Sequence, residues 1–84
     1  MTIFICVLGV DPERVDWNFP FLPRIGEHMY IADFIPEIDR TKVSDDTLEV
    51  VDIQWIKIDG EICPVLFLGD EDSEIPDIKS LQLN

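Results

Sequence analysis

Hydrophobic positions alternate along much of the chain at the period of β-strands, and the first predicted strand is apolar on both faces. It runs from Thr2 to Leu8, with Ile3, Ile5 and Val7 on one face and Phe4, Cys6 and Leu8 on the other. A strand without a polar face is covered on both sides. The pattern therefore predicts the central strand of a small barrel or sandwich.

The clearest turn in the sequence is Asp59-Gly60, which separates two apolar runs and predicts a β-hairpin over residues 48 to 68. Counting outward from this turn gives the pairs Lys57–Ile62, Trp55–Pro64, Ile53–Leu66 and Val51–Leu68. Cross-strand partners share a face, so one side of the core is expected to hold Trp55, Ile53, Val51, Leu66 and Leu68. The polar positions change phase between Gln54 and Lys57, which predicts a β-bulge or bend near Trp55–Ile56.

Pro64 lies in the second arm of this hairpin. Proline has no N–H to donate to a neighbouring strand, so this arm is expected to be an edge, or to have no neighbour, at Pro64. An open edge can accept a strand from a partner or from a second copy of the chain.

The segment before the hairpin contains a predicted helical turn and an aromatic stretch. In DPERVDW, Asp11 as a cap and Pro12 at the first helical position predict one or two helical turns near residues 11–17. Trp17, Phe19 and Phe21 then alternate with other residues in a proline-containing, extended stretch, which is expected to wrap across the outside of the barrel.

Pro23 and Gly26 frame a sharp corner, because proline fixes φ and glycine accepts a positive φ. The corner leads into a predicted strand from Glu27 to Ile35. Its sequence, Pro23-Arg24-Ile25-Gly26-Glu27, resembles the way in which many small SH3-like β-barrel modules begin a strand. This resemblance covers a dozen or so residues and implies a fold type, with no activity and no functional residues attached to it.

These elements predict one domain over residues 1–84 with an all-β fold. We expect a small, strongly bent antiparallel barrel or sandwich of about five strands, with one short helical turn near residues 11–17. The acidic C-terminal segment, residues 70–84, fits either a last short strand or a turn of helix.

Charge narrows the range of partners. Eighteen acidic and six basic residues give a net charge of −12. Such a balance disfavours direct binding to nucleic acid or to an anionic membrane, and it permits cationic partners. The chain has no apolar run long enough to span a membrane and no recognisable signal peptide, so we expect a cytoplasmic protein.

Cys6 and Cys63 both lie in apolar runs. They are expected to be buried free thiols, as in most cytoplasmic proteins. A disulfide between them would require the first and last strands to be neighbours.

Groups of catalytic residues are nearly absent from the sequence. His28 is the only histidine and lies among apolar residues of a predicted strand, where a structural role is expected rather than general base catalysis. There is no phosphate-binding or metal-binding motif, and the acidic run from Asp70 lacks the glycine and the terminal glutamate of an EF-hand loop. We therefore expect no enzymatic activity, no cofactor and no bound metal.

The function expected from these observations is a non-catalytic protein-interaction module, which binds a protein partner or a second copy of itself through the edge strand. The residues predicted to contact the partner are Trp17, Phe19, Phe21, Arg24 and Pro64, since aromatic and arginine side chains dominate many interfaces. In the alternative interpretation, the three aromatic side chains cap the open end of the barrel and have no partner.

Two other functions remain open. The chain is also compatible with an acidic mimic of nucleic acid, of the kind that phages use to block a DNA- or RNA-binding protein, and the residues of such a surface would be Asp45, Asp46, Glu49, Asp52, Asp70, Glu71, Asp72 and Glu74. A barrel that binds a small ligand is the third possibility, and it requires an apolar pocket near Trp55 or Tyr30.

Overall fold

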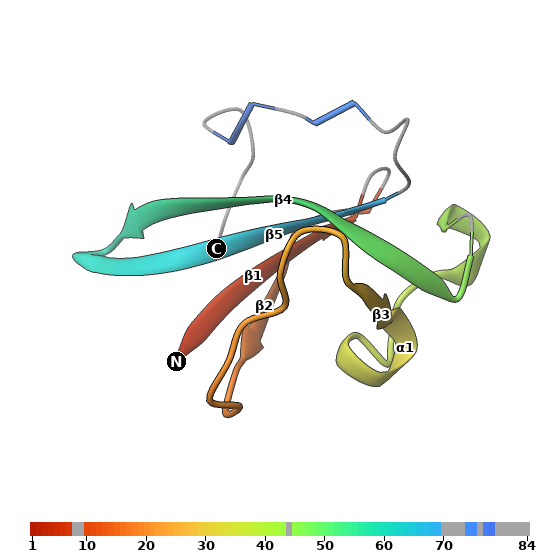
Figure 1. Cartoon of the computed structure of the whole chain (residues 1–84), viewed down its shortest axis with the longest axis horizontal. Helices are drawn as coiled ribbons and strands as arrows, with labels where there is room; N and C mark the ends of the chain where they lie inside the picture. Colours follow the sequence, from red (N-terminus) through yellow and green to blue (C-terminus); the bar gives the residue numbers. More distant parts are fainter. Residues whose placement is uncertain (8–9, 44, 70–73, 76, 79–84) are drawn as a thin grey trace.

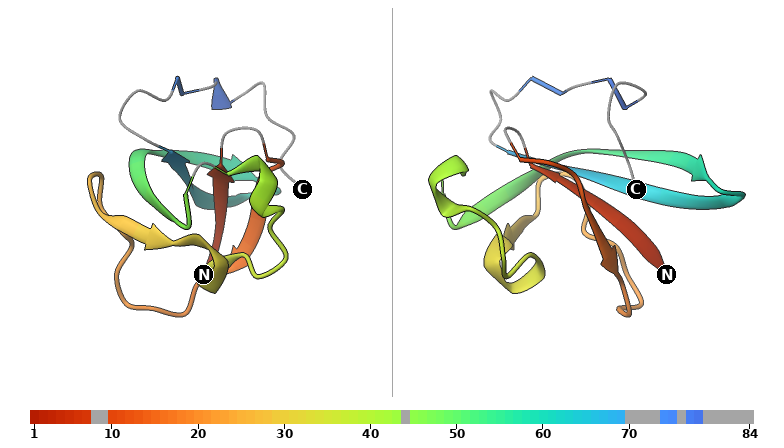
Figure 2. Two further views of the ribbon diagram at one scale, coloured as in Figure 1. Left: turned by 90° about the vertical axis from the view of Figure 1, so that its right-hand side faces the viewer. Right: turned by 180° about the vertical axis from the view of Figure 1, so that it is seen from behind.

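Five strands form one sheet that curls into half a barrel in the computed structural model, which describes residues 1–7, 10–43, 45–69, 74–75 and 77–78 (Figures 1 and 2). The order across the sheet is β2-β1-β5-β4-β3. The strands are β1 (Thr2–Val7), β2 (Glu13–Asp16), β3 (His28–Tyr30), β4 (Thr47–Ile58) and β5 (Glu61–Gly69). A one-turn helix α1 (Ile31–Phe34) and a 3-10 turn η1 (Arg40–Lys42) connect β3 to β4. The all-β fold is as predicted.

The two central strands run parallel, whereas every other neighbouring pair in the sheet is antiparallel. In the β1–β5 ladder, Phe4 lies beside Val65 and Val7 beside Leu68. The fully antiparallel sheet expected from the sequence is therefore wrong at its centre. The hairpin placed β5 beside β4 correctly, but nothing in the local pattern fixed the direction of β1 against it.

Both faces of β1 are buried, as its sequence predicts. Ile3, Ile5 and Val7 belong to the larger core cluster, inside the curl of the sheet. Phe4 and Cys6 belong to a second cluster on the opposite face. β5 divides in the same way, with Leu66 and Leu68 in the first cluster and Cys63, Val65 and Phe67 in the second.

The β4–β5 hairpin turns at Asp59 and Gly60, both of which have positive φ, 51° and 83°. These values match a type I′ turn. The predicted pairs Lys57–Ile62, Trp55–Pro64 and Ile53–Leu66 are confirmed.

The bulge in β4 is at Val51, and its prediction near Trp55–Ile56 was wrong. The register shifts between Val50 and Asp52, so Val50 takes the place opposite Leu68 and Val51 packs against the second cluster. The extra residue at Val51 lets Val50 lie on the inner face, where it is fully buried. The bulge therefore lies four residues before the position that the polar pattern predicted.

Trp55 does not enter the core, contrary to its prediction, and is 57% exposed. Its place near the tip of the hairpin explains this exposure. The β1–β5 ladder begins at Val65, so β1 forms no ladder pair with Pro64, the residue opposite Trp55.

Pro64 lies on a central strand, so the prediction that β5 forms an edge was wrong, whereas the alternative prediction, that Pro64 has no ladder partner on its far side, agrees with the register. The missing N–H causes no break in the sheet, because the ladder with β1 starts one residue later, at Val65. The side chain of Pro64 is fully buried. The two edges of the sheet are β2 and β3.

The helical turn predicted near residues 11–17 is absent, and strand β2 takes its place. Its residues pair with β1 from Thr2↔Asp16 to Ile5↔Glu13, and Val15 packs against the larger core cluster. Pairing with β1 and partial burial of Val15 therefore outweigh the local capping preferences of Asp11 and Pro12.

The strand predicted from Glu27 to Ile35 ends at Tyr30, and α1 follows. A strand would turn Phe34 to the opposite face from Ile31 and Ile35, whereas one turn of helix brings all three to the same face. All three pack in the larger cluster.

Cys6 and Cys63 are buried and free. Although their strands are neighbours, Cys6 lies beside Phe67, four residues along β5 from Cys63. At the rise of a strand this offset is about 13 Å, which exceeds the reach of a disulfide. Burial also raises the pKa of the Cys6 thiol.

We expect Gly60→Ala to lower the free energy of unfolding by about 1–2 kcal/mol, because a Cβ disfavours the left-handed backbone that Gly60 adopts. Apart from residue 60 itself and its two chain neighbours, no residue has an atom within 4 Å of the added Cβ, so the cost is conformational rather than steric. Urea unfolding measures the change. Gly60→Asn is the control and should lose less stability, since Asn tolerates this conformation; equal losses would contradict the turn geometry.

Candidate functional site

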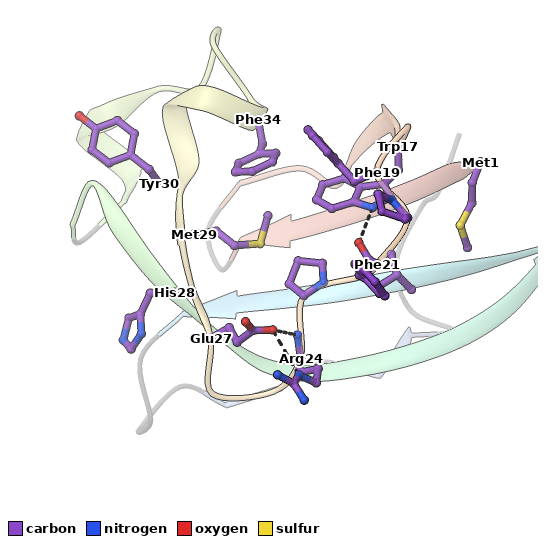
Figure 3. Close-up of a pocket in the computed structure, with 13 residues that line it drawn as sticks. Met1, Trp17, Phe19, Phe21, Arg24, Glu27, His28, Met29, Tyr30 and Phe34 are labelled. Atoms are coloured by element: carbon purple, nitrogen blue, oxygen red, sulfur yellow. Dashed lines mark hydrogen bonds and ion pairs between the residues drawn. The ribbon is translucent and has the colours of Figure 1, made fainter.

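An aromatic cleft of about 1050 Å³ opens on the side of the half-barrel that the sheet leaves unclosed (Figure 3). Its walls come from the connection between β2 and β3, from β3 itself and from α1. The aromatic side chains in these walls are Trp17, Phe19, Phe21, Tyr30 and Phe34. We call this feature the aromatic cleft.

Trp17 forms the base of the cleft. Its side chain is 6% exposed, and its indole Nε1–H donates to the carbonyl of Phe21 at 2.9 Å. The indole stacks on Phe34 at 5.5 Å between ring centroids and meets Phe19 edge-on at 5.0 Å. A backbone bond from Trp17 N to Met1 O, 2.7 Å, continues the β1–β2 pairing as far as this residue. Trp17 therefore fixes the aromatic segment to the residue that precedes β1 and to the helix α1.

Phe19 and Phe21 are exposed, at 63% and 80%. The segment that carries them includes Pro20 and Pro23, which cannot donate backbone hydrogen bonds and therefore disfavour a further strand here. The two rings thus lie on a fixed but non-ladder segment, with much of their surface in contact with solvent.

The Pro23–Glu27 segment forms the sharp corner that the sequence predicts. The N–H of Glu27 donates to Arg24 O at 3.0 Å, and Gly26 has φ 95°, the arrangement of a type II turn with glycine at its third position. Gly26 N then bonds to Val50 O at 2.9 Å, and Val50 N bonds to Glu27 O at 2.8 Å. Two residues thus oppose one, as in a bulge that begins with glycine, and the chain joins β4 at this point.

Arg24 lies on the rim of the cleft. The Glu27 carboxylate accepts the backbone N–H of Arg24 and lies 3.7 Å from its guanidinium. Because the Arg24 side chain is 88% exposed, this ion pair leaves its other donors facing solvent.

On the other side of the corner, β3 presents its side chains alternately. Met29 and Phe34 point toward Trp17 and Phe19, whereas His28 and Tyr30 point away (Figure 3). His28 Nε2 is 3.8 Å from Glu49 Oε1 on β4. This histidine is exposed and paired with a carboxylate, with no nucleophile against it in the described structure.

Four of the five residues predicted to bind a partner meet at the aromatic cleft: Trp17, Phe19, Phe21 and Arg24. Pro64 does not line it and is buried in the sheet. Sequence reasoning missed Met29 and Phe34 as parts of this site. The helical spacing of Ile31, Phe34 and Ile35 is the sequence signal from which the position of Phe34 could have been predicted.

The acidic residues predicted for a nucleic-acid mimic are only partly placed. Asp45, Asp46 and Glu74 are exposed, and Glu49 and Asp52 are half-buried. Glu49 lies near His28, and Asp52 accepts a hydrogen bond from the Gln54 amide at 2.8 Å. Asp70, Glu71 and Asp72 lie outside the described residues.

Within the described ranges, no group of three or more His, Cys, Asp or Glu side chains is placed to hold a metal ion. No helix in that part of the chain is both long and apolar enough to cross a membrane.

Comparison with known proteins gives no match to a family model, to a curated protein or to a solved structure. The resemblance to SH3-like modules therefore stays a prediction.

We expect Trp17→Phe to lower the free energy of unfolding by about 1–3 kcal/mol, because it removes the bond to the Phe21 carbonyl and part of a buried ring system. Trp55→Phe is the matched control, with an expected change within about 0.5 kcal/mol at an exposed position. Chemical unfolding measures both variants.

The same two variants also separate the tryptophans by fluorescence. Trp55→Phe retains the buried Trp17 and should give blue-shifted emission that acrylamide quenches weakly, whereas Trp17→Phe should give red-shifted emission that acrylamide quenches strongly. The reverse order would contradict the placement of Trp17 at the base of the cleft.

Proposed function

We propose that this protein is a non-catalytic interaction module that binds a segment of another protein in the aromatic cleft. The observation that carries the proposal is the exposure of Phe19 and Phe21 beside a preformed cleft. Single exposed apolar side chains are common on protein surfaces, but grouped ones around a concavity are typical of binding sites.

The chemistry of the cleft suits a polypeptide ligand. Aromatic side chains and arginine are the residues most enriched at the energetic centres of protein interfaces, and both are present here. Phe19 and Phe21 supply large apolar surfaces with few rotatable bonds, and Arg24 adds exposed donors at the rim.

The cleft is also held in place before any ligand arrives. Trp17 ties the aromatic segment to Phe34, and the Arg24–Glu27 turn ties its far end to β4 through Val50. A binding surface that is already ordered loses less conformational entropy on association, so even the short aromatic segment can contribute to binding.

A small apolar ligand is the second function that the cleft supports, because its volume of about 1050 Å³ lies at the upper end of small-molecule sites. The acidic mimic gains no comparable support, since Glu49 and Asp52 already interact with neighbouring side chains.

Selection of displayed random peptides against the immobilised protein tests the main proposal. We expect peptides whose synthetic versions bind in calorimetry, and whose affinity falls at least about tenfold when Phe19 and Phe21 are both changed to Ser. The matched control changes Trp55 and Ile62 to Ser, a pair of similarly exposed apolar residues near the hairpin tip, and should leave the affinity unchanged.

Three results would contradict the proposal of a peptide-binding cleft: no enriched peptide, equal losses in the two double variants, or a loss only in the hairpin variant. Binding of apolar dyes or fatty acids that depends on Phe19 and Phe21, without any enriched peptide, would instead favour the small-ligand function.

A further inference from the structure

We infer that the ligand of the aromatic cleft is an extended, basic polypeptide segment that adds as a strand to the open edge of β3. This inference rests on the proposed function and specifies both the side of the cleft and the chemistry of the partner.

The pairing of β3 with β4 determines which backbone groups are open. Glu27 O accepts from Val50 N, and Ile31 N donates to Asp46 O, so residues 27, 29 and 31 direct their backbone groups toward β4. His28 and Tyr30, between them, direct theirs away from β4. Within the part of the chain that the structure describes, no strand pairs with this side of β3.

Three of these outward groups are available to a ligand. They are the N–H and C=O of His28 and the N–H of Tyr30. The fourth outward group, the Tyr30 carbonyl, is already used, because it lies at the N-cap of α1 and accepts the first hydrogen bond of that helix. Alternate residues of an extended chain can pair with all three.

The cleft borders the backbone edge of β3 rather than one face of it. His28, Met29 and Tyr30 all line the cleft although their side chains point alternately to opposite sides (Figure 3). A row of consecutive strand residues lines a cavity in this way when the edge itself forms the wall. A strand laid along this edge would also lie against the aromatic side chains of the cleft.

The charge of the chain favours a basic partner. From Asp16 to Glu37, the chain that builds the cleft carries four acids, Asp16, Glu27, Asp33 and Glu37, and one arginine. All four acids are exposed, and the whole chain has a net charge of −12. Glu27 is the one of these acids that lines the cleft, and it pairs with Arg24, so the attraction for a cation comes from the acids next to the cleft and from the net charge. Lysine or arginine residues flanking an apolar anchor would match this charge and the aromatic wall.

The same charge argues against a second copy of this chain as the occupant, since two molecules of −12 repel one another at close approach. The other edge, β2, is a poorer docking strand. Its outward-directed residues are Arg14 and Asp16, and none of its residues, Glu13–Asp16, lines the cleft.

A synthetic peptide of about nine residues, alternating lysine and valine with a central tryptophan, tests the inference by titration and by NMR shift mapping of the intact protein. We expect shifts in β3 and in the aromatic segment. The peptide with glutamate in place of lysine should bind at least about a hundredfold more weakly, and added salt should reduce that difference.

Strand pairing is tested separately from charge. N-methylation at the alternate residues of one edge of the peptide should lower the affinity at least about tenfold, whereas methylation along the other edge should not. On the protein, His28→Pro removes an outward N–H that β4 does not use and should also weaken binding about tenfold. Arg14→Pro makes the same change at an outward-directed residue of β2, away from the cleft, and is the control, with an expected affinity within about threefold of the original.

The outcomes separate this inference from the proposed function. Equal binding of the lysine and glutamate peptides, no binding of the lysine peptide, or indifference to both methylation patterns overturns the inference, even if selected peptides still depend on Phe19 and Phe21. Loss of that dependence overturns the proposed function itself. If His28→Pro fails to fold, the methylated peptides decide the question.

Discussion

The parallel pairing of β1 with β5 is the constraint on which the rest of the structure depends. These two strands are buried on both faces, and each contributes to both core clusters. Once they occupy the centre, β2 and β3 can only be the edges, and five strands curl the sheet without closing it. The chain must then pass from one edge to the other between residues 16 and 28. That passage forms the wall of the aromatic cleft, so the site follows from the order of the strands.

The connecting segment is built to cover this gap without completing the sheet. Its prolines prevent a regular ladder, and Trp17 and Phe34 supply the apolar contacts that would otherwise come from a sixth strand. The rings of Phe19 and Phe21 extend beyond that contact into solvent. Trp17 therefore covers the core, whereas the two phenylalanines keep most of their surface exposed to solvent.

The sequence was informative wherever a local rule acted alone. The hairpin turn needed only Asp59-Gly60, the corner needed Gly26, and the two-faced burial of β1 needed only its apolar run. Predictions failed where a distant strand decided the outcome. Asp11 and Pro12 are good helix-starting residues, yet Glu13–Asp16 form a strand that pairs with β1. Pro64 suggested an edge, but the start of the β1 ladder one residue later made its missing N–H harmless.

The candidate site was predictable in part for the same reason. Trp17, Phe19, Phe21 and Arg24 are close in sequence, so their composition was enough to group them. Met29 and Phe34 join them only because α1 interrupts the strand predicted from Glu27 to Ile35. A single helical turn has too few residues to distinguish the period of a helix from that of a strand.

An open edge must be protected against unwanted pairing, and this chain protects its two edges differently. Both are short, which limits the number of hydrogen bonds that a second molecule can gain. β2 adds charged side chains at each outward position, whereas β3 is flanked by the aromatic cleft and followed at once by a helix. Backbone pairing alone carries little sequence information, because any extended chain offers the same groups. If β3 pairs with a partner as proposed, its selectivity must come from side chains, and the net charge of −12 would oppose acidic chains, including copies of this one.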